Sequence, residues 1–160
     1  MKDVKIGTLI FALLITLATG GLSAALSSRG MAIYGTMNKP PLSPPAWVFS
    51  IAWTILYIMM GLSLYMVMTS DGDPKKRRTA LILFAVQLVM NFMWSLVFFN
   101  LSWYLFAFVW LIGMWVIVIA CAVKFFTLNK TATLLFIPYI LWLTFAAYLN
   151  MGAYILSPKG

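Results

Sequence analysis

The chain has 160 residues and a net charge of +8, and 64% of its residues are hydrophobic while only 9% are charged. Its mean hydropathy of +1.00 excludes an ordinary soluble domain, which is about half apolar and about a quarter charged. The chain has no histidine, one cysteine and three acidic residues. This inventory excludes the usual zinc sites, paired catalytic carboxylates and serine or cysteine triads, so we expect no metal site and no conventional catalytic residues.

Five continuously apolar runs are each long enough to cross a bilayer as a helix, which takes about 20 residues. Strands of a membrane barrel would instead alternate apolar and polar residues. The sequence therefore predicts an all-α integral membrane protein whose single domain, residues 1–160, is a five-transmembrane-helix bundle. The expected helices span about residues 4–26, 46–68, 79–99, 103–125 and 132–156.

The first run begins like a secretory signal, with Lys2 and Lys5 before the apolar stretch. It is longer than a usual signal core, and small residues recur at every fourth position, which allows close packing between helices in lipid. These residues are Thr8, Ala12, Thr16, Gly20, Ala24 and Ser28. We expect a retained helix whose small residues pack against another helix of the same chain, with a second copy of the chain as the alternative.

Residues 27–45 form the longest connection between predicted helices, and we expect them to cover one end of the bundle like a lid. Pro44 and Pro45, at the end of this connection, suit the entry to the second helix because a proline in the first turn loses no hydrogen bond. After them, Phe49, Trp53 and Tyr57 follow at intervals of four residues. This spacing places three aromatic rings on one face of the second helix.

Basic residues are distributed unevenly between the two sides of the predicted bundle. Of the eleven Lys and Arg residues, three fall on the side of the proline-rich connection, namely Arg29, Lys39 and Lys159. The others fall on the side of the N-terminus: Lys2, Lys5, Lys75, Lys76, Arg77, Arg78, Lys124 and Lys130. The positive-inside rule then predicts a cytoplasmic N-terminus in a bacterial plasma membrane. The run at 75–78 is typical of contact with anionic lipid, and we expect no nucleic-acid partner.

Polar residues in the third and fifth runs indicate an internal cavity. Gln87, Asn91 and Ser95 share one face of the third helix with Trp94 beside them, and a buried amide needs a partner, so this face should point into the bundle. The amides either connect helices or line a cavity. On the fifth helix, Trp142, Ala146, Asn150 and Ala153 fall roughly on one face. Together these residues predict an uncharged, aromatic cavity for a flat hydrophobic ligand such as a tetrapyrrole, a sterol or a drug-like aromatic compound.

Three stretches, in this order, resemble the tryptophan-rich sensory protein family, whose mitochondrial members are called translocator protein or peripheral-type benzodiazepine receptor. They are the proline–aromatic stretch 39–57, the stretch 87–99 with QLVMNFMWS, and the stretch 138–150 with PYILW and a final Leu-Asn. The resemblance covers nearly the whole chain. It implies a five-helix membrane bundle, often a homodimer, that binds porphyrins such as protoporphyrin IX and, in some members, cholesterol and isoquinoline or benzodiazepine drugs.

The resemblance also implies site residues, while no cofactor is expected beyond the tetrapyrrole ligand itself. The aromatic wall would be Trp53 and Trp142 and the amide would be Asn91. The complete set of expected ligand-binding residues is Tyr34, Phe49, Trp53, Tyr57, Asn91, Trp94, Trp142 and Ala146. The chain has Ile33 and Leu42 where the family usually has tryptophan, so two aromatic residues of the lid are missing.

Four functions remain open at this point. The first is a membrane receptor or carrier for tetrapyrroles, in porphyrin homeostasis or stress sensing. The second is light-dependent oxidative degradation of bound protoporphyrin IX, with Trp53 and Trp142 as oxidisable indoles. The third is transport of a sterol or another lipophilic ligand; Leu149, Tyr154 and Lys159 satisfy a loose spacing proposed for cholesterol contact. The fourth is a structural role, in which the aromatic faces only pack.

Overall fold

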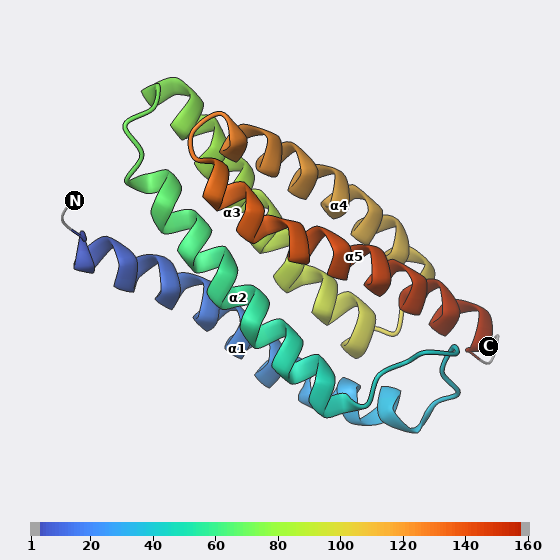
Figure 1. The fold of residues 1–160 in the computed structure, drawn as a ribbon. Helices are drawn as coiled ribbons and strands as arrows, with labels where there is room; N and C mark the ends of the chain where they lie inside the picture. The colour runs from blue at the N-terminus through green and yellow to red at the C-terminus, as the bar shows by residue number, and fades with distance from the viewer. Residues whose placement is uncertain (1–3, 158–160) are drawn as a thin grey trace.

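The computed structural model describes residues 4–157 and shows five helices packed into one elongated bundle (Figure 1). The helices are α1 (Ile6–Thr36), α2 (Ala46–Met68), α3 (Pro74–Ser95) with its π-helical continuation η1 (Leu96–Asn100), α4 (Tyr104–Phe126) and α5 (Lys130–Leu156). All five are long and apolar enough to cross a membrane, and residues 4–157 include no strand. The predicted all-α membrane bundle is thereby confirmed.

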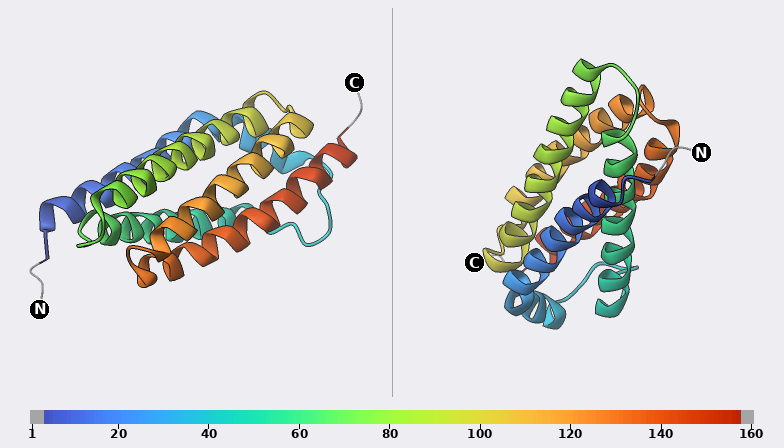
Figure 2. Two further views of the ribbon diagram at one scale, coloured as in Figure 1. Left: turned by 90° about the horizontal axis from the view of Figure 1, so that it is seen from above. Right: turned by 90° about the vertical axis from the view of Figure 1, so that its left-hand side faces the viewer.

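The helices alternate in direction, so the described chain begins at one end of the bundle and finishes at the other (Figure 2). The α2–α3 and α4–α5 connections lie at the end where α1 begins (Figure 1). The basic residues Lys5, Lys75–Arg78, Lys124 and Lys130 therefore gather at that end, and Arg29 and Lys39 lie toward the other. Lys2, Asp3 and Lys159 fall outside the described residues.

The first helix is longer than predicted, and the predicted boundary at residue 26 is wrong. α1 continues through Thr36, so the connection to α2 comprises residues 37–45 rather than 27–45. Small residues explain the extension: Ser27 and Gly30 are buried, and a Cβ at Gly30 would meet the carbonyl group of Phe99. Packing against η1 thus stabilises a segment that is too polar to be predicted as a span.

Helix caps determine where α3 and α5 begin, and both begin earlier than predicted. The Asp73 carboxylate accepts a hydrogen bond from the Lys75 backbone N–H at 2.8 Å, and Pro74 occupies the first helical position. This is a favourable start for a helix, so α3 begins at residue 74 instead of 79. The Asn129 side chain caps α5 in the same way by accepting from the Ala132 N–H at 3.0 Å.

The small residues of α1 pack against α2 of the same chain, as expected. Ala12 and Thr16 are fully buried, and a Cβ at Gly61 of α2 would lie 2.8 Å from the Thr16 hydroxyl. One turn further, Gly20 approaches the Tyr57 ring so closely that a Cβ would clash with it. The pattern ends there, because the next small residue, Ala24, is exposed.

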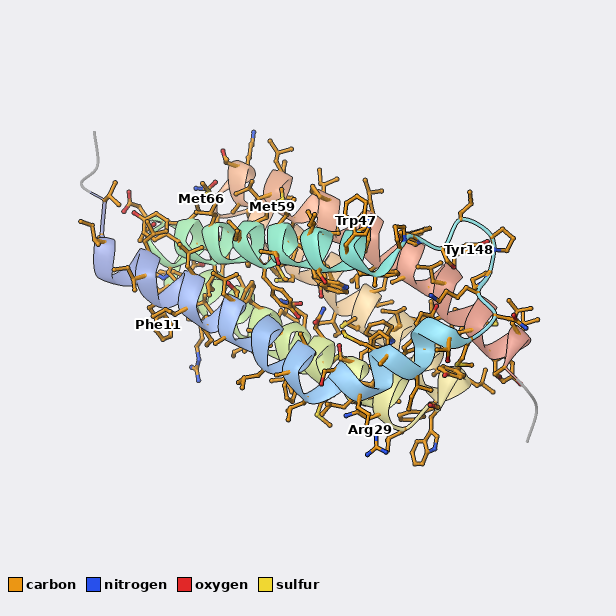
Figure 3. The ribbon with its side chains drawn as sticks, turned by 90° about the horizontal axis from the view of Figure 1, so that it is seen from below. Phe11, Arg29, Trp47, Met59, Met66 and Tyr148 are labelled. Atoms are coloured by element: carbon orange, nitrogen blue, oxygen red, sulfur yellow. The ribbon has the colours of Figure 1, made fainter. Side chains whose placement is uncertain are left out.

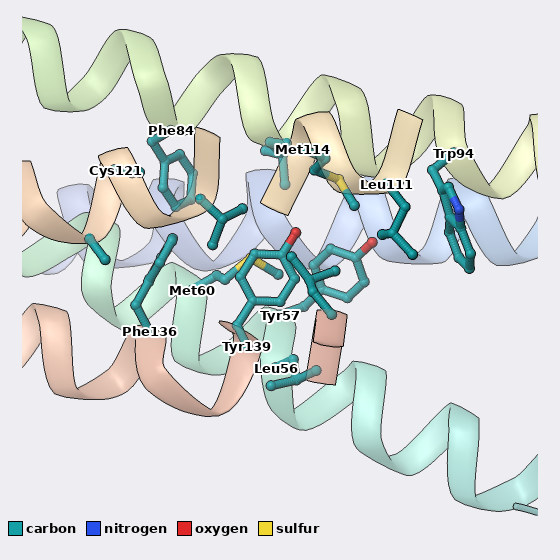
Figure 4. Close-up of a cluster of buried hydrophobic side chains, with 14 of the residues drawn as sticks. Leu56, Tyr57, Met60, Phe84, Trp94, Leu111, Met114, Cys121, Phe136 and Tyr139 are labelled. Atoms are coloured by element: carbon teal, nitrogen blue, oxygen red, sulfur yellow. The ribbon is translucent and has the colours of Figure 1, made fainter. Parts of the chain in front are cut away.

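A dense aromatic and sulfur-containing core fills the bundle between α2, α3, α4 and α5 (Figure 4). The rings of Phe84, Phe125 and Phe136 lie within 5.1–6.1 Å of one another, and Cys121 and Met60 are fully buried beside them. Such close packing favours one fixed arrangement of side chains. The core therefore holds the helices rigidly in the half of the bundle away from the 37–45 connection.

Candidate functional site

A cavity of about 380 Å³ lies between α1, α2, α3 and α5, beneath the 37–45 connection. This volume falls within the range of about 300–1,000 Å³ that is typical of small-molecule sites. All eight residues that the sequence predicts as ligand-binding line it: Tyr34, Phe49, Trp53, Tyr57, Asn91, Trp94, Trp142 and Ala146. The structure thus brings together residues from four segments of the chain, and their contact with a ligand stays a prediction.

Two tryptophans from different helices form the aromatic wall of the cavity. The rings of Trp53 and Trp142 meet edge to face, with centroids 6.3 Å apart and planes at 84°. Phe49 packs against Trp142 in the same manner at 5.8 Å, and Tyr57 lies 5.7 Å from Trp53. Edge-to-face contacts are favourable for aromatic rings. They hold the wall in place without a ligand, because the four-residue spacing on α2 aligns its three rings.

Residues in and next to η1 form another part of the cavity wall. There Trp94 stacks on Phe98 with centroids 5.1 Å apart, and Phe99 lines the cavity. The Leu101 N–H bonds to the Leu96 carbonyl, five residues earlier, at 3.2 Å. This wider turn changes the direction of the side chains that follow it, and such turns are frequent at functional sites.

A chain of hydrogen bonds begins at two residues that line the cavity, Tyr57 and Asn91. The Tyr57 hydroxyl donates to Asn91 Oδ1 at 2.6 Å, and Asn91 Nδ2 donates to the Tyr139 hydroxyl at 2.9 Å. The Tyr139 hydroxyl then donates to Gln87 Oε1 at 3.0 Å. Asn91 therefore has both expected roles: it connects α2, α3 and α5, and it also lines the cavity. One N–H and one lone pair of its amide remain for a ligand.

The indole N–H of Trp142 is a buried donor with no hydrogen-bond partner among the described residues. Three other indoles do have partners: Trp94 donates to Asn150, Trp110 to the Met90 carbonyl, and Trp115 to Thr144. An unsatisfied buried donor costs about 1–3 kcal/mol. Among the described residues, Trp142 is the only tryptophan whose buried N–H lacks a partner, and this residue lines the cavity.

Asn150 has a structural role instead of lining the cavity. Its Oδ1 accepts from the Trp94 indole at 3.1 Å, and its Nδ2 donates to the Tyr104 carbonyl at 2.7 Å. It fixes the plane of the Trp94 ring. Ile33 and Leu42, where the family usually has tryptophan, are 55% and 84% exposed and do not line the cavity.

Sequence reasoning missed several residues that line the cavity. Gly20 and Ala24 of α1 were expected to pack only against a helix, yet they form part of the wall. Phe99 belongs to a stretch that suggested the family, but its direction depends on η1. Lys39 also lines the cavity, and no periodic pattern could have placed it there, because it lies in the connection.

A second hollow, of about 510 Å³, lies on the outer surface between α4, α5 and the prolines of the connection. Its lining is apolar, and it includes Ile112, Met151 and Ile155, so it suits contact with lipid chains. Of the proposed cholesterol pattern, Leu149 is buried, Tyr154 is exposed and Lys159 falls outside the described residues. A sterol on the outer surface could therefore not reach Leu149.

Comparison with known proteins agrees with these features. The TspO/MBR family model matches residues 10–156. The tryptophan-rich protein TspO of Chlorobaculum tepidum is 34% identical over 155 residues, which cover 96% of this chain and 98% of that protein. The tryptophan-rich sensory protein of Cereibacter sphaeroides is 39% identical over 75% of this chain and 73% of its own.

The similarity extends to animals. The translocator protein of Bos taurus is 34% identical over 134 residues, which cover 82% of this chain and 79% of that protein. These matches, spread over bacterial and mammalian proteins, support a receptor or transporter role in a membrane. The chain belongs to the TspO/MBR family of integral membrane proteins.

Proposed function

We propose that this protein is a membrane receptor or carrier that binds a tetrapyrrole such as protoporphyrin IX in the cavity between α1, α2, α3 and α5. The observation that carries the proposal is the aromatic wall of Trp53 and Trp142, two residues that line a cavity of about 380 Å³. A flat aromatic ligand would stack on these indoles. No further cofactor is proposed, since stacking and area burial suffice for such a ligand.

The proposal is tested by titrating the protein in lipid nanodiscs with protoporphyrin IX in the dark, following quenching of tryptophan fluorescence. Saturable binding is expected. Trp142→Phe should weaken it about tenfold, because part of the stacking surface is lost. Trp47→Phe is the matched control. Trp47 lies in the first turn of α2, the helix that also carries Trp53, but it is 65% exposed and does not line the cavity. Quenching that never saturates, or equal effects of both changes, would contradict the proposal.

A second candidate is light-dependent oxidative degradation of the bound porphyrin, and the contact between Trp53 and Trp142 favours it. Molecular oxygen would be the oxidant: the light-excited porphyrin would transfer its energy to oxygen, and the singlet oxygen formed would add to a double bond of the macrocycle and open it, so that both oxygen atoms end in the product. The two indoles would hold the excited ring in a fixed position for this addition. Illumination of the complex in air should then bleach the porphyrin faster than in empty nanodiscs. If Phe at both positions left the bleaching rate unchanged, this candidate would be wrong.

Transport of the ligand, including a sterol, is a third candidate. It would appear as protein-dependent flux into sealed vesicles, whereas a receptor would bind without flux. The residues described here offer no charged side chain in the middle of a span, so passive handover fits better than coupled transport. We also propose the bacterial plasma membrane as the location, a cytoplasmic N-terminus, and a homodimer as implied by the family resemblance.

A further inference from the structure

We infer that Lys39 binds an acidic group of the ligand, so that the cavity selects flat hydrophobic molecules that carry a carboxylate at one edge. This inference rests on the proposed function and adds the chemical class of the ligand. The hydrophobic body would lie against Trp53 and Trp142, and the carboxylate would meet the Lys39 ammonium where the connection covers the cavity.

Lys39 is the only charged residue among the described residues that line the cavity. Its Nζ lies 5.5 Å from the centroid of the Tyr34 ring, which also lines the cavity. The described acidic residues, Asp71 and Asp73, lie in or beside the α2–α3 connection at the opposite end of the bundle. A cation is thus held over an aromatic ring beside an otherwise uncharged cavity, and a carboxylate of the ligand would be its closest anionic partner.

The connection is attached to the bundle on both sides of Lys39. Before it, the Met37 sulfur accepts a hydrogen bond from the Tyr104 hydroxyl of α4 at 3.2 Å. After it, Pro40 is buried against Gly152 of α5, where a Cβ would lie 2.5 Å from the proline ring. The Pro41 carbonyl accepts from the Tyr148 hydroxyl at 2.7 Å. These contacts hold the backbone on both sides of Lys39, which itself lines the cavity.

Proline chemistry adds to this positioning. Because Pro40 follows Lys39, steric contact disfavours the helical conformation at Lys39 and favours an extended one. The ring of Pro40 also fixes its own φ. The Lys39 backbone is therefore restricted before any ligand arrives, which lowers the entropy that binding must remove.

Arg29 is the other basic residue at this end of the described chain, and the structure separates the two. Arg29 is exposed, does not line the cavity, and points away from the bundle (Figure 3). Its charge contributes to the general potential at this end without touching the ligand. It is therefore the matched control for a specific effect of Lys39.

The test compares protoporphyrin IX, which has two carboxylates, with its dimethyl ester, which has none, by dark titration in nanodiscs of neutral lipid. Lys39→Gln should weaken binding of the free acid about tenfold, the loss expected for one charge-assisted hydrogen bond, and leave the ester unchanged. Lys39→Arg should keep the preference for the acid, because it keeps the charge. Arg29→Gln should leave both affinities as they are. Added salt should weaken the free acid alone.

The outcomes separate this inference from the proposed function. Suppose that the ester binds saturably and that Lys39→Gln either weakens binding of the acid and the ester equally or weakens binding of neither. The inference is then overturned, while the cavity remains the binding site. An equal loss of acid affinity in Arg29→Gln would also overturn it, because the effect would be general attraction. If neither compound binds the unchanged protein saturably, the proposed function falls, and the inference falls with it.

Discussion

Each hydroxyl and amide in the hydrogen-bond chain from Tyr57 to Gln87 has a partner on another helix. The Tyr139 hydroxyl illustrates this arrangement, because it accepts from Asn91 of α3 and donates to Gln87 one turn away. Tyr139 is fully buried and does not line the cavity. Its contribution should therefore concern the stability of the bundle rather than ligand contact.

Tyr139→Phe should reduce the free energy of unfolding by about 1–2 kcal/mol, because the Asn91 N–H and the Gln87 oxygen lose their common partner. The single cysteine provides the measurement: Cys121 is fully buried, so a thiol-reactive dye labels it only as the bundle opens on heating. Tyr154→Phe, at an exposed position, is the control. Equal labelling curves for both variants would show that the hydrogen-bond chain adds no stability.

At the scale of the helices, small residues decide how α1 packs. Gly30 lies against the Phe99 backbone, which cannot move aside like a flexible side chain, whereas a Cβ at Gly21 would meet nothing within 4 Å. Both glycines belong to the same helix. They therefore offer a comparison in which helix propensity is the same and packing differs.

Gly30→Ala should destabilise the protein by about 1–3 kcal/mol through overpacking, while Gly21→Ala should stabilise it by up to about 1 kcal/mol through helix propensity. Cys121 labelling on heating measures both. The opposite signs are the essential result. A gain in stability for Gly30→Ala would mean that α1 does not pack closely on η1.

Hydropathy predicted which segments form helices, but packing and capping determined where they begin and end. The α2 range agrees with the prediction, because prolines mark its start. Asp73 and Pro74 form a helix start that the sequence alone could have indicated. The prediction followed hydropathy instead and began α3 at residue 79. The extension of α1 past Ser27 and the turn at η1 depend on contacts between distant segments, which no local pattern contains. The eight residues expected at the site do line one cavity, since helical spacing and family motifs both indicate side-chain direction.

At the scale of the whole molecule, the distribution of charge predicts the orientation in the membrane. Most described basic residues lie at the end where α1 begins, which the positive-inside rule assigns to the cytoplasm. A fluorescent protein that folds only in the cytoplasm should be bright at the N-terminus and dark at the C-terminus. Replacing Lys75–Arg78 by neutral residues should weaken this preference. Fluorescence at the C-terminus alone would contradict the proposed orientation and indicate the opposite one.

The central claim is that the ligand lies inside the bundle, and a crystal structure of the protein grown with protoporphyrin IX in the dark tests it most directly. We predict porphyrin density between α1, α2, α3 and α5, with the ring against Trp53 and Trp142 and a carboxylate near Lys39. Density only in the outer hollow between α4 and α5 would contradict the account. The aromatic wall would then serve packing alone.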